Sequence, residues 1–280
     1  MTTTDTLKLG AVQKTLLLPL WGRAVETRKA RPLLSDPTAV RIIESIDYDF
    51  SSIAANISFV SRLGWVARSL HIDRTIQEFL KRFPAATIVN LGCGLDTTFE
   101  RVDNGSLRWY DLDLPDVIEL RREYVQEGPR RRFIACSVLE ESWMSAVEIA
   151  EGLLLIAAGL LYYFEESQVR TLFGRIAERF PACELVCDVC SPKGAEIANR
   201  RVIRDGGMDK DATLKWGLRK AADIHAWDPR ITILADYPIF RGLKKNFSLK
   251  EKWGTFLSDT MRAISMLHLA VAAKDKSRAR

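Results

Sequence analysis

The sequence has no hydrophobic run long enough to cross a membrane. Its longest nearly pure apolar stretch, residues 152–164, has 13 residues, whereas a transmembrane helix needs about 20. The first residues, Met1–Thr6, also lack the charged segment and the apolar core of a secretory signal peptide. We therefore expect a protein of the cytoplasm that makes no contact with a membrane.

Cysteine and histidine are scarce, with five and three residues among 280. An odd and thinly spread set of cysteines is typical of a reducing compartment rather than of a disulfide scaffold. Cys183, Cys187 and Cys190 lie close together, but a strand would point Cys187 and Cys190 to opposite faces, and no second Cys or His pair lies nearby. We expect buried thiols and no metal site.

Strong charge of one sign is also missing. The net charge is +5, but residues 274–280 carry four basic side chains and one acidic one, which leaves 37 basic and 35 acidic residues in the rest of the chain. A nearly neutral body offers no continuous basic groove, so a nucleic-acid partner is not expected.

The pattern along the chain predicts one α/β domain that spans residues 1–280. Residues 1–83 contain helical patterns and no convincing strand, and from residue 84 apolar runs alternate with helical stretches, which is typical of a doubly wound, mostly parallel sheet. The expected strands are 87–91, 107–112, 132–135, 153–157, 184–189 and 230–235. The expected helices are 13–26, one that begins at Asp36-Pro37, 58–83, 96–102, 116–126, 141–149, 165–180 and 249–272.

A glycine-rich turn follows the first expected strand. Gly92 and Gly94 stand two residues apart, a spacing that permits a tight turn and a close approach of a ligand to the backbone. A dinucleotide fingerprint would place a third glycine at Thr97, and Asp96 would bring negative charge near the phosphates. These two departures argue against an NAD-dependent oxidoreductase.

The second expected strand ends in an acidic residue, Asp113, which lies 21 positions beyond Gly92. A carboxylate at the tip of this strand can accept hydrogen bonds from both hydroxyl groups of a ribose. The turn and the carboxylate together indicate a nucleoside ligand without phosphates, and S-adenosylmethionine meets that description.

These motifs resemble the leucine carboxyl methyltransferase family, especially its branch of bacterial polyketide O-methyltransferases. The resemblance covers most of the chain. Its motifs are Leu20–Glu26, Leu34–Pro37, Arg68 with Ile72-Asp73, Val89–Thr97, Asp111–Pro115, Gly159–Tyr163, Lys215–Gly217 and Trp227–Pro229.

The resemblance implies a class I, Rossmann-like S-adenosylmethionine-dependent O-methyltransferase with a seven-stranded sheet and a helical N-terminal cap. Arg68 would bind the carboxylate of the cofactor, Gly92, Gly94 and Asp96 would line its amino-acid end, and Asp113 would bind the ribose. A planar, bidentate guanidinium suits the role given to Arg68.

Two positions depart from the family pattern. Beside the adenine, where the family has an acidic residue, this chain has Ser137 and Val138, and at the tip of the fourth strand Ala158 replaces a glutamate. Each change removes a carboxylate from the expected cofactor site. The departures favour, as an alternative, a protein that binds the cofactor without turnover.

Methyl transfer is an in-line displacement, so the main task of the protein is alignment. A carboxylate acceptor needs no general base, whereas a phenol or an alcohol benefits from one. Tyr163, His225 and Glu26 are the candidates for that role, and Tyr163 is the expected catalytic residue. Trp21, Arg23 and Tyr163 are expected to line the acceptor pocket.

The expected acceptor is a small molecule methylated on a carboxylate or hydroxyl oxygen, and the expected assembly is a monomer or a homodimer. Arg23 would attract an anionic acceptor, which favours a small acid or phenol. Methylation of a protein C-terminus remains the alternative within the same class.

Overall fold

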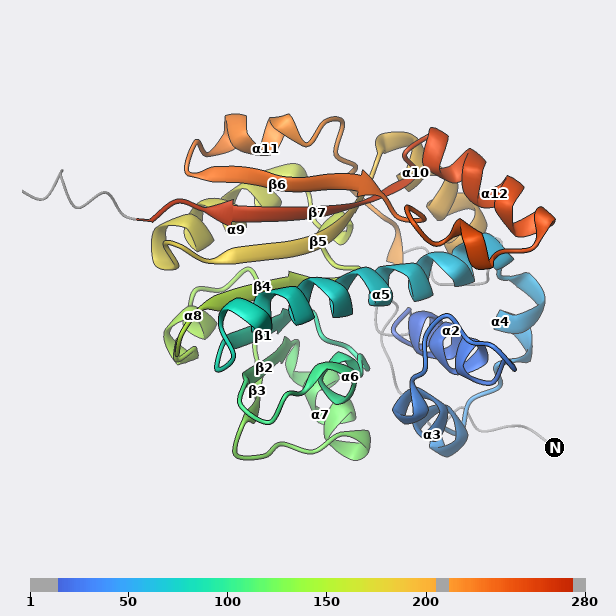
Figure 1. The fold of residues 1–280 in the computed structure, drawn as a ribbon, viewed down its shortest axis with the longest axis horizontal. Helices are drawn as coiled ribbons and strands as arrows, with labels where there is room; N and C mark the ends of the chain where they lie inside the picture. Colours follow the sequence, from blue (N-terminus) through green and yellow to red (C-terminus); the bar gives the residue numbers. More distant parts are fainter. Residues whose placement is uncertain (1–14, 205–211, 274–280) are drawn as a thin grey trace, which may run out of the picture.

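The computed structural model describes residues 15–204 and 212–273 of the chain. Within these residues, seven strands form a single sheet in the order β3-β2-β1-β4-β5-β7-β6. The strands from β1 to β5 pair in parallel, and β7 runs antiparallel between β5 and β6. The prediction of a mostly parallel, doubly wound sheet is confirmed (Figure 1).

The strands are short and largely buried, as expected for a sheet covered on both faces. They are β1 (Thr87–Leu91), β2 (Arg108–Asp113), β3 (Arg131–Ala135), β4 (Leu153–Ala157), β5 (Glu184–Cys190), β6 (Ile231–Pro238) and β7 (Ile264–Val271).

Helices cover both faces of the sheet, and four of the described ones, α2 to α5, precede the first strand in the chain. The main helices are α2 (Leu17–Thr27), α3 (Pro37–Ser45), α4 (Ser51–Asn56), α5 (Phe59–Arg82), α6 (Thr98–Val102), α7 (Pro115–Tyr124), α8 (Ser142–Ala146), α9 (Glu166–Arg179), α10 (Pro192–Ala198), α11 (Ala222–Trp227) and α12 (Leu249–Thr260). A short 3₁₀ turn, η1 (Leu161–Tyr163), follows β4, and a π-helical segment, η2 (Asn199–Arg204), continues α10.

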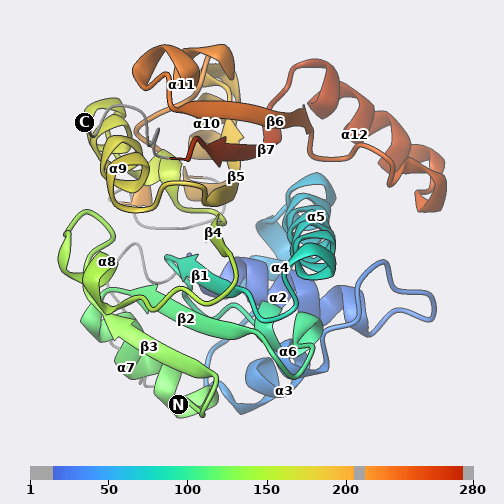
Figure 2. The ribbon, with the colours of Figure 1, turned by 60° about the vertical axis from the view of Figure 1, so that its left-hand side comes forward.

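Two apolar layers hold the helices against the sheet. On one face, residues of α8, α9 and α11 pack against alternate residues of the strands, such as Val89 and Leu155. On the other face, α5 and α6 cover the intervening residues, such as Ile88 and Leu154. Figures 1 and 2 show α5 lying along its face of the sheet. Because successive side chains of a strand point to opposite faces, each strand contributes apolar residues to both layers.

Local signals explain where the N-terminal helices begin. Asp36 caps α3 by accepting a hydrogen bond from the Ala39 N–H at 2.9 Å, and Pro37 occupies the first turn. Ser58 caps α5 through the Ser61 N–H at 3.1 Å. Residues 13 and 14 of the expected first helix lie outside the described residues, and α2 begins at Leu17.

The expected helix over residues 249–272 is wrong in its second half. Helix α12 ends at Thr260, Arg262 has a φ of 46°, and residues 264–271 form β7. This segment becomes a strand because its backbone pairs with β5 on one side and β6 on the other. Such pairing joins residues up to 86 positions apart, as Glu184 and Ala270 are, so a local pattern does not encode it.

Within the described residues, no helix is both long and apolar enough to span a membrane. The basic residues 274–280 lie outside the described part of the chain, as do residues 1–6. The division into one domain, a cytoplasmic location and the oligomeric state stay predictions.

Candidate active site

The glycine turn lies at the carboxyl end of β1, in the centre of the sheet. Gly92 and Gly94 have φ values of +65° and +47°, which side chains with a Cβ rarely adopt. A Cβ on Gly92 would also lie 2.6 Å from Leu160, and one on Gly94 would lie 2.7 Å from Leu16. The conformation therefore favours glycine at the two positions singled out by the sequence, and a larger residue would also have to displace the ends of these two leucine side chains.

A buried arginine stabilises the backbone of the turn through hydrogen bonds. Arg121 of α7 donates hydrogen bonds to the carbonyl oxygens of Gly94 and Asp96, at 2.7 and 2.8 Å, and pairs with Asp111 at 3.0 Å. Arg131 pairs with the same Asp111 carboxylate at 2.8 Å. Because these groups are almost fully buried, the network fixes the backbone that faces the ligand.

Asp113 stands at the tip of β2, directly beside the glycine turn. Its carboxylate accepts hydrogen bonds from the N–H groups of Gly94, at 2.7 Å, and Leu114, at 2.8 Å. Burial raises the pKa of Asp113, and these two hydrogen bonds oppose the rise. Each oxygen has a second lone pair, so the carboxylate can still accept hydrogen bonds from a ligand.

Asp96 adds a second negative charge to the turn. Burial acts to raise its pKa, but the cations of Arg23 and Arg101 outweigh burial and hold the pKa well below its usual range. The Asp96 carboxylate also accepts hydrogen bonds from the Thr98 N–H at 3.0 Å and the Asn90 amide at 3.2 Å. Asp96 is therefore a fixed anion at neutral pH.

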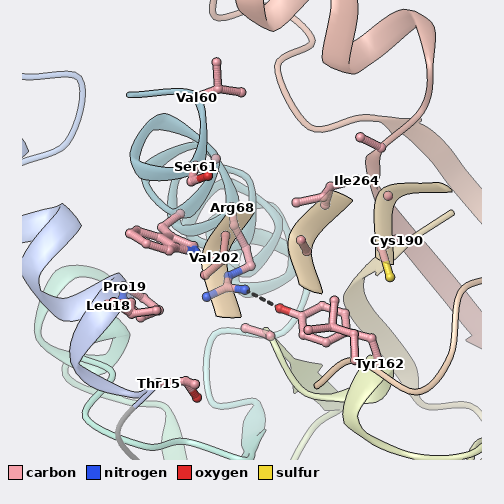
Figure 3. Close-up of a pocket in the computed structure, with 18 of the residues that line it drawn as sticks. Thr15, Leu18, Pro19, Val60, Ser61, Arg68, Tyr162, Cys190, Val202 and Ile264 are labelled. Carbon is pink, nitrogen blue, oxygen red and sulfur yellow. Dashed lines mark hydrogen bonds between the residues drawn. The ribbon is translucent and has the colours of Figure 1, made fainter. Parts of the chain in front are cut away.

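Arg68 reaches the site from the middle of α5. One of its terminal nitrogens, Nη1, donates to Asp188 of β5 at 3.1 Å. The same nitrogen donates to the hydroxyl of Tyr162 at 3.2 Å (Figure 3). The other oxygen of Asp188 accepts the Gly159 N–H at 2.6 Å. In the described part of the chain, the Nη2 and Nε atoms of Arg68 donate no hydrogen bond, which leaves part of the guanidinium for an anionic ligand.

A single cavity of about 590 Å³ joins these groups. Its lining includes most of the residues expected at the cofactor: Arg68, Gly92, Gly94, Asp96, Asp113 and Ala158. Figure 3 shows side chains from α2, α5, η2 and the ends of the strands arranged around this space. The size is within the range of small-molecule sites, about 300–1,000 Å³.

Three other expected residues lie outside the lining of this cavity. Trp21 is buried in a small apolar cluster with Leu18, Ile53 and Ile57. Ser137 follows β3 and donates its backbone N–H to Glu140, and Val138 belongs to the apolar layer under α8 and α9. Their expected contacts with substrate or cofactor stay predictions.

Arg23 lines the cavity, but its guanidinium group already forms ion pairs and a hydrogen bond with other protein groups. Its Nε donates to Asp36 at 2.9 Å and its Nη2 to the carbonyl oxygen of Leu95 at 3.3 Å, while Nη1 lies 3.8 Å from Asp96. Arg101 pairs with the same Asp36 oxygen at 2.7 Å. Arg23 thus ties α2 to α3 and the glycine turn.

Each candidate for a general base either lies outside the cavity or stays protonated at neutral pH. Tyr163 lines the cavity and its hydroxyl donates to Thr15 at 3.4 Å, but burial raises its pKa. His225 is exposed on α11, where its Nδ1 lies 2.7 Å from the carbonyl oxygen of Ile231, and Glu26 is buried with the Leu33 N–H and Lys29. Neither lines the cavity.

Cys183, directly before β5, and Cys187 and Cys190 within it are buried, as expected. Burial raises the pKa of Cys183 and Cys190 to about 12. Among residues 15–204 and 212–273, no three His, Cys, Asp or Glu side chains form a group that could hold a metal ion.

Sequence reasoning missed Asp188 and Arg121. Asp188 lies within a strand whose seven residues are all buried, and that burial of a carboxylate is the signal that a cation must lie nearby. Strand alternation places Asp188 on the same face as Val186, which packs in the apolar layer of α5.

Comparisons with known proteins agree with this geometry. The family model "Leucine carboxyl methyltransferase" matches residues 17–177. The tetracenomycin polyketide synthesis O-methyltransferase TcmP of Streptomyces glaucescens is 31% identical over 273 residues, which cover 95% of this chain and 96% of that protein. An S-adenosyl-L-methionine-dependent methyltransferase, dpfgK, of Gibberella zeae is 31% identical over 61% of this chain and 62% of that protein.

A solved structure supports the fold. A DUF574 family protein from Streptomyces avermitilis superposes with a TM-score of 0.58 and 12% identity, over 92% of this chain and 97% of that chain. The resemblance found in the motifs and the class of S-adenosylmethionine-dependent O-methyltransferases that it implied are confirmed. The chain belongs to the leucine carboxyl methyltransferase family.

Proposed function

We propose that the protein transfers a methyl group from S-adenosylmethionine to an acidic oxygen of a small molecule. One observation carries the proposal: a single cavity places the carboxylates of Asp96 and Asp113 and the guanidinium of Arg68 around the turn of Gly92 and Gly94. This distribution of charge matches a ligand that has both an ammonium group and a carboxylate.

The charges at the sheet end of the cavity fit the cofactor group by group. Asp113 has acceptor capacity for the two ribose hydroxyls, and the unused nitrogens of Arg68 would bind the carboxylate of the methionine part. Asp96 would stabilise the ammonium group, since its carboxylate remains ionised. When bound, the cofactor supplies a methyl group on a positively charged sulfur.

The lining of the cavity favours an acceptor that is already an anion. Among the described lining residues there is no histidine and no glutamate. Burial raises the pKa values of Tyr162 and Tyr163, and that of Cys190 to about 12, so these groups remain protonated at neutral pH. A carboxylate or an acidic phenol needs no base, and for it the protein supplies alignment and exclusion of water.

The protein would therefore contribute positions more than proton transfers. Tyr162 and Asp188 orient Arg68, and Arg121 fixes the turn on which the cofactor would lie. Helices α2 and α5 form part of the cavity wall, and a wall of this kind would limit the access of water to the displacement. Tyr163, which lies on the wall, would contact the acceptor rather than deprotonate it.

Isothermal titration calorimetry with S-adenosylmethionine, S-adenosylhomocysteine and NAD tests the cofactor. Binding of the first two and none of NAD is the expected result, and tight binding of NAD instead would overturn the proposal.

Transfer of a labelled methyl group to a panel of aromatic and aliphatic acids, phenols and a peptide with a free C-terminus tests the reaction. Methylation of a small acid or phenol is the expected result. Methylation of the peptide alone would favour the protein C-terminus, and binding of the cofactor without transfer to any compound would favour a protein without turnover.

A further inference from the structure

The cavity has two ends of different character. The end beside the sheet contains both lining carboxylates, Asp96 and Asp113. The distal end lies between the first turns of α5, the segment formed by α10 and η2, and helix α12. Its apolar lining residues are Phe59, Val60, Ile197, Val202, Trp253, Leu257 and Met261.

Helix α12 presents an exposed apolar stripe at this distal end. Trp253, Leu257 and Met261 are spaced four residues apart, so they lie along one side of the helix. They line the cavity and are nevertheless 73%, 52% and 39% exposed. An apolar patch of this kind on a cavity wall indicates a surface that a ligand covers.

The close contact between α12 and α5 holds this stripe in place. A Cβ on Gly254 would lie 2.9 Å from the side chains of both Phe59 and Val60, at the start of α5. At the other end of α12, a Cβ on Gly194 would lie 2.0 Å from the carbonyl oxygen of Ala263, which brings α10 against the turn before β7. The distal end is therefore built from closely packed elements.

The charge at the distal end is of one sign. Arg200, Arg201 and Lys250 belong to its lining, whereas no described lining residue there is acidic. The Nζ atom of Lys250 lies 5.7 Å from the ring centroid of Phe59, so the cation sits over the apolar wall. A neutral or cationic ligand gains nothing from these groups, but an anionic ligand does.

Resting on the proposed function, we propose that the distal end is the acceptor site and that it binds a flat aromatic acid. The ring system lies on Trp253, Leu257 and Met261, because a flat aromatic body covers such a stripe and stacks on the indole. The cations of Arg201 and Lys250 select the anionic form. Trp253 is thus a specificity-determining residue on α12, outside the N-terminal helices from which an acceptor wall was expected.

The probe for this site is 1-anilinonaphthalene-8-sulfonate, a flat aromatic anion whose fluorescence rises in apolar surroundings. It is titrated into full-length protein saturated with S-adenosylhomocysteine. Wild type should bind it at one saturable site, and Trp253→Ala should weaken that binding at least tenfold. Phe256→Ala is the matched control, because Phe256 is 54% exposed on the same helix, lies under the Nζ of Lys244 and does not line the cavity.

The charge is tested with N-phenyl-1-naphthylamine, an uncharged relative of the probe. Wild type should prefer the anionic probe, and the double variant Arg201→Gln/Lys250→Gln should reduce that preference at least fivefold while binding of the neutral probe is unchanged. Thermal unfolding of every variant shows that the fold is intact, and Leu257→Gln provides a second change on the stripe.

Two results would overturn the inference. One is equal binding of the anionic probe to wild type and to Trp253→Ala and Leu257→Gln. The other is binding of the probe to ligand-free protein that is lost in protein saturated with S-adenosylhomocysteine, which would place the probe at the cofactor end. Calorimetry with S-adenosylhomocysteine alone is a separate measurement. If wild type does not bind this ligand, the proposed function is refuted, but the location of the aromatic site is not.

Discussion

Arg68 of α5 and Asp188 of β5 form a buried ion pair at 3.1 Å across 120 residues of sequence. Asp188 uses its second oxygen to accept the N–H of Gly159, where a Cβ would lie 2.5 Å from the arginine. The pair therefore joins the long helix, the tip of β4 and the centre of the sheet. It also aims the guanidinium into the cavity.

The first prediction concerns Asp188. Asp188→Ala leaves Arg68 as a buried cation without its partner, and the loss of one member of a buried pair costs about 3–5 kcal/mol of unfolding free energy. Urea unfolding measures this loss. Asp188→Asn keeps the size of the side chain and an acceptor for Gly159, so we expect a smaller loss of stability, and equal losses in the two variants would contradict the role given to the charge.

Arg68 itself gives the second prediction. Arg68→Lys should weaken S-adenosylhomocysteine at least tenfold, because a hydrogen bond between charged groups is worth about 1.5–3 kcal/mol and a lysine cannot reproduce the planar fork. Adenosine, which lacks the carboxylate, should bind wild type and variant alike. Arg74→Lys, an exposed change on the same helix, is the control. A variant that loses both ligands equally would indicate a purely structural arginine.

The third prediction concerns Asp113. Asp113→Ala removes charged hydrogen bonds worth about 1.5–3 kcal/mol, a tenfold to hundredfold loss of affinity for S-adenosylhomocysteine in calorimetry. Glu123→Gln neutralises an exposed carboxylate on α7 and should leave the affinity unchanged. Unchanged binding in Asp113→Ala would remove this residue from the site.

The same carboxylate gives a fourth prediction, on pH. Burial raises the pKa of Asp113, and the ionised form accepts the stronger, charge-assisted hydrogen bonds from the ribose hydroxyls. Affinity should therefore be full above this raised pKa and fall as pH decreases through it. Asp96 does not contribute, because its pKa is held far below that range. Asp113→Asn should bind weakly at every pH without this step, and a step that persists in the variant would assign the titration to another group.

The sequence predicted the parts of the site that depend on local signals. The turn of Gly92 and Gly94 and the carboxylate of Asp113 follow short buried strands, and parallel pairing brings the ends of β1 and β2 together. Arg68 was found through the family resemblance, since a single arginine on a long helix has no distinctive local pattern. Ala158, at the end of β4, was placed in the same way.

Contacts between distant segments set the limit of that prediction. Asp188 and Arg68 meet only because β5 lies under α5, and residues 264–271 form a strand only because β5 and β6 flank them. Arg23 was interpreted as a ligand for the acceptor because the sequence does not show that Asp36 and Leu95 surround it. In each case the partner is supplied by tertiary structure.

The last prediction separates these two roles of Arg23. As a binding residue it would affect the acceptor alone, whereas its pairing with Asp36, at 2.9 Å and almost fully buried, predicts an effect on the fold. Arg23→Gln should lower the unfolding free energy by about 3 kcal/mol, at the low end for a broken buried pair, because Arg101 still neutralises Asp36. Arg28→Gln, which breaks the exposed pair with Glu44 at the end of the same helix, should cost less than about 1 kcal/mol.

Urea unfolding of both variants compares these two losses. Calorimetry with S-adenosylhomocysteine should also show weaker binding in Arg23→Gln, because the backbone of the glycine turn loses the hydrogen bond at Leu95. Equal stability of the two variants would return Arg23 to the acceptor pocket as a free cation.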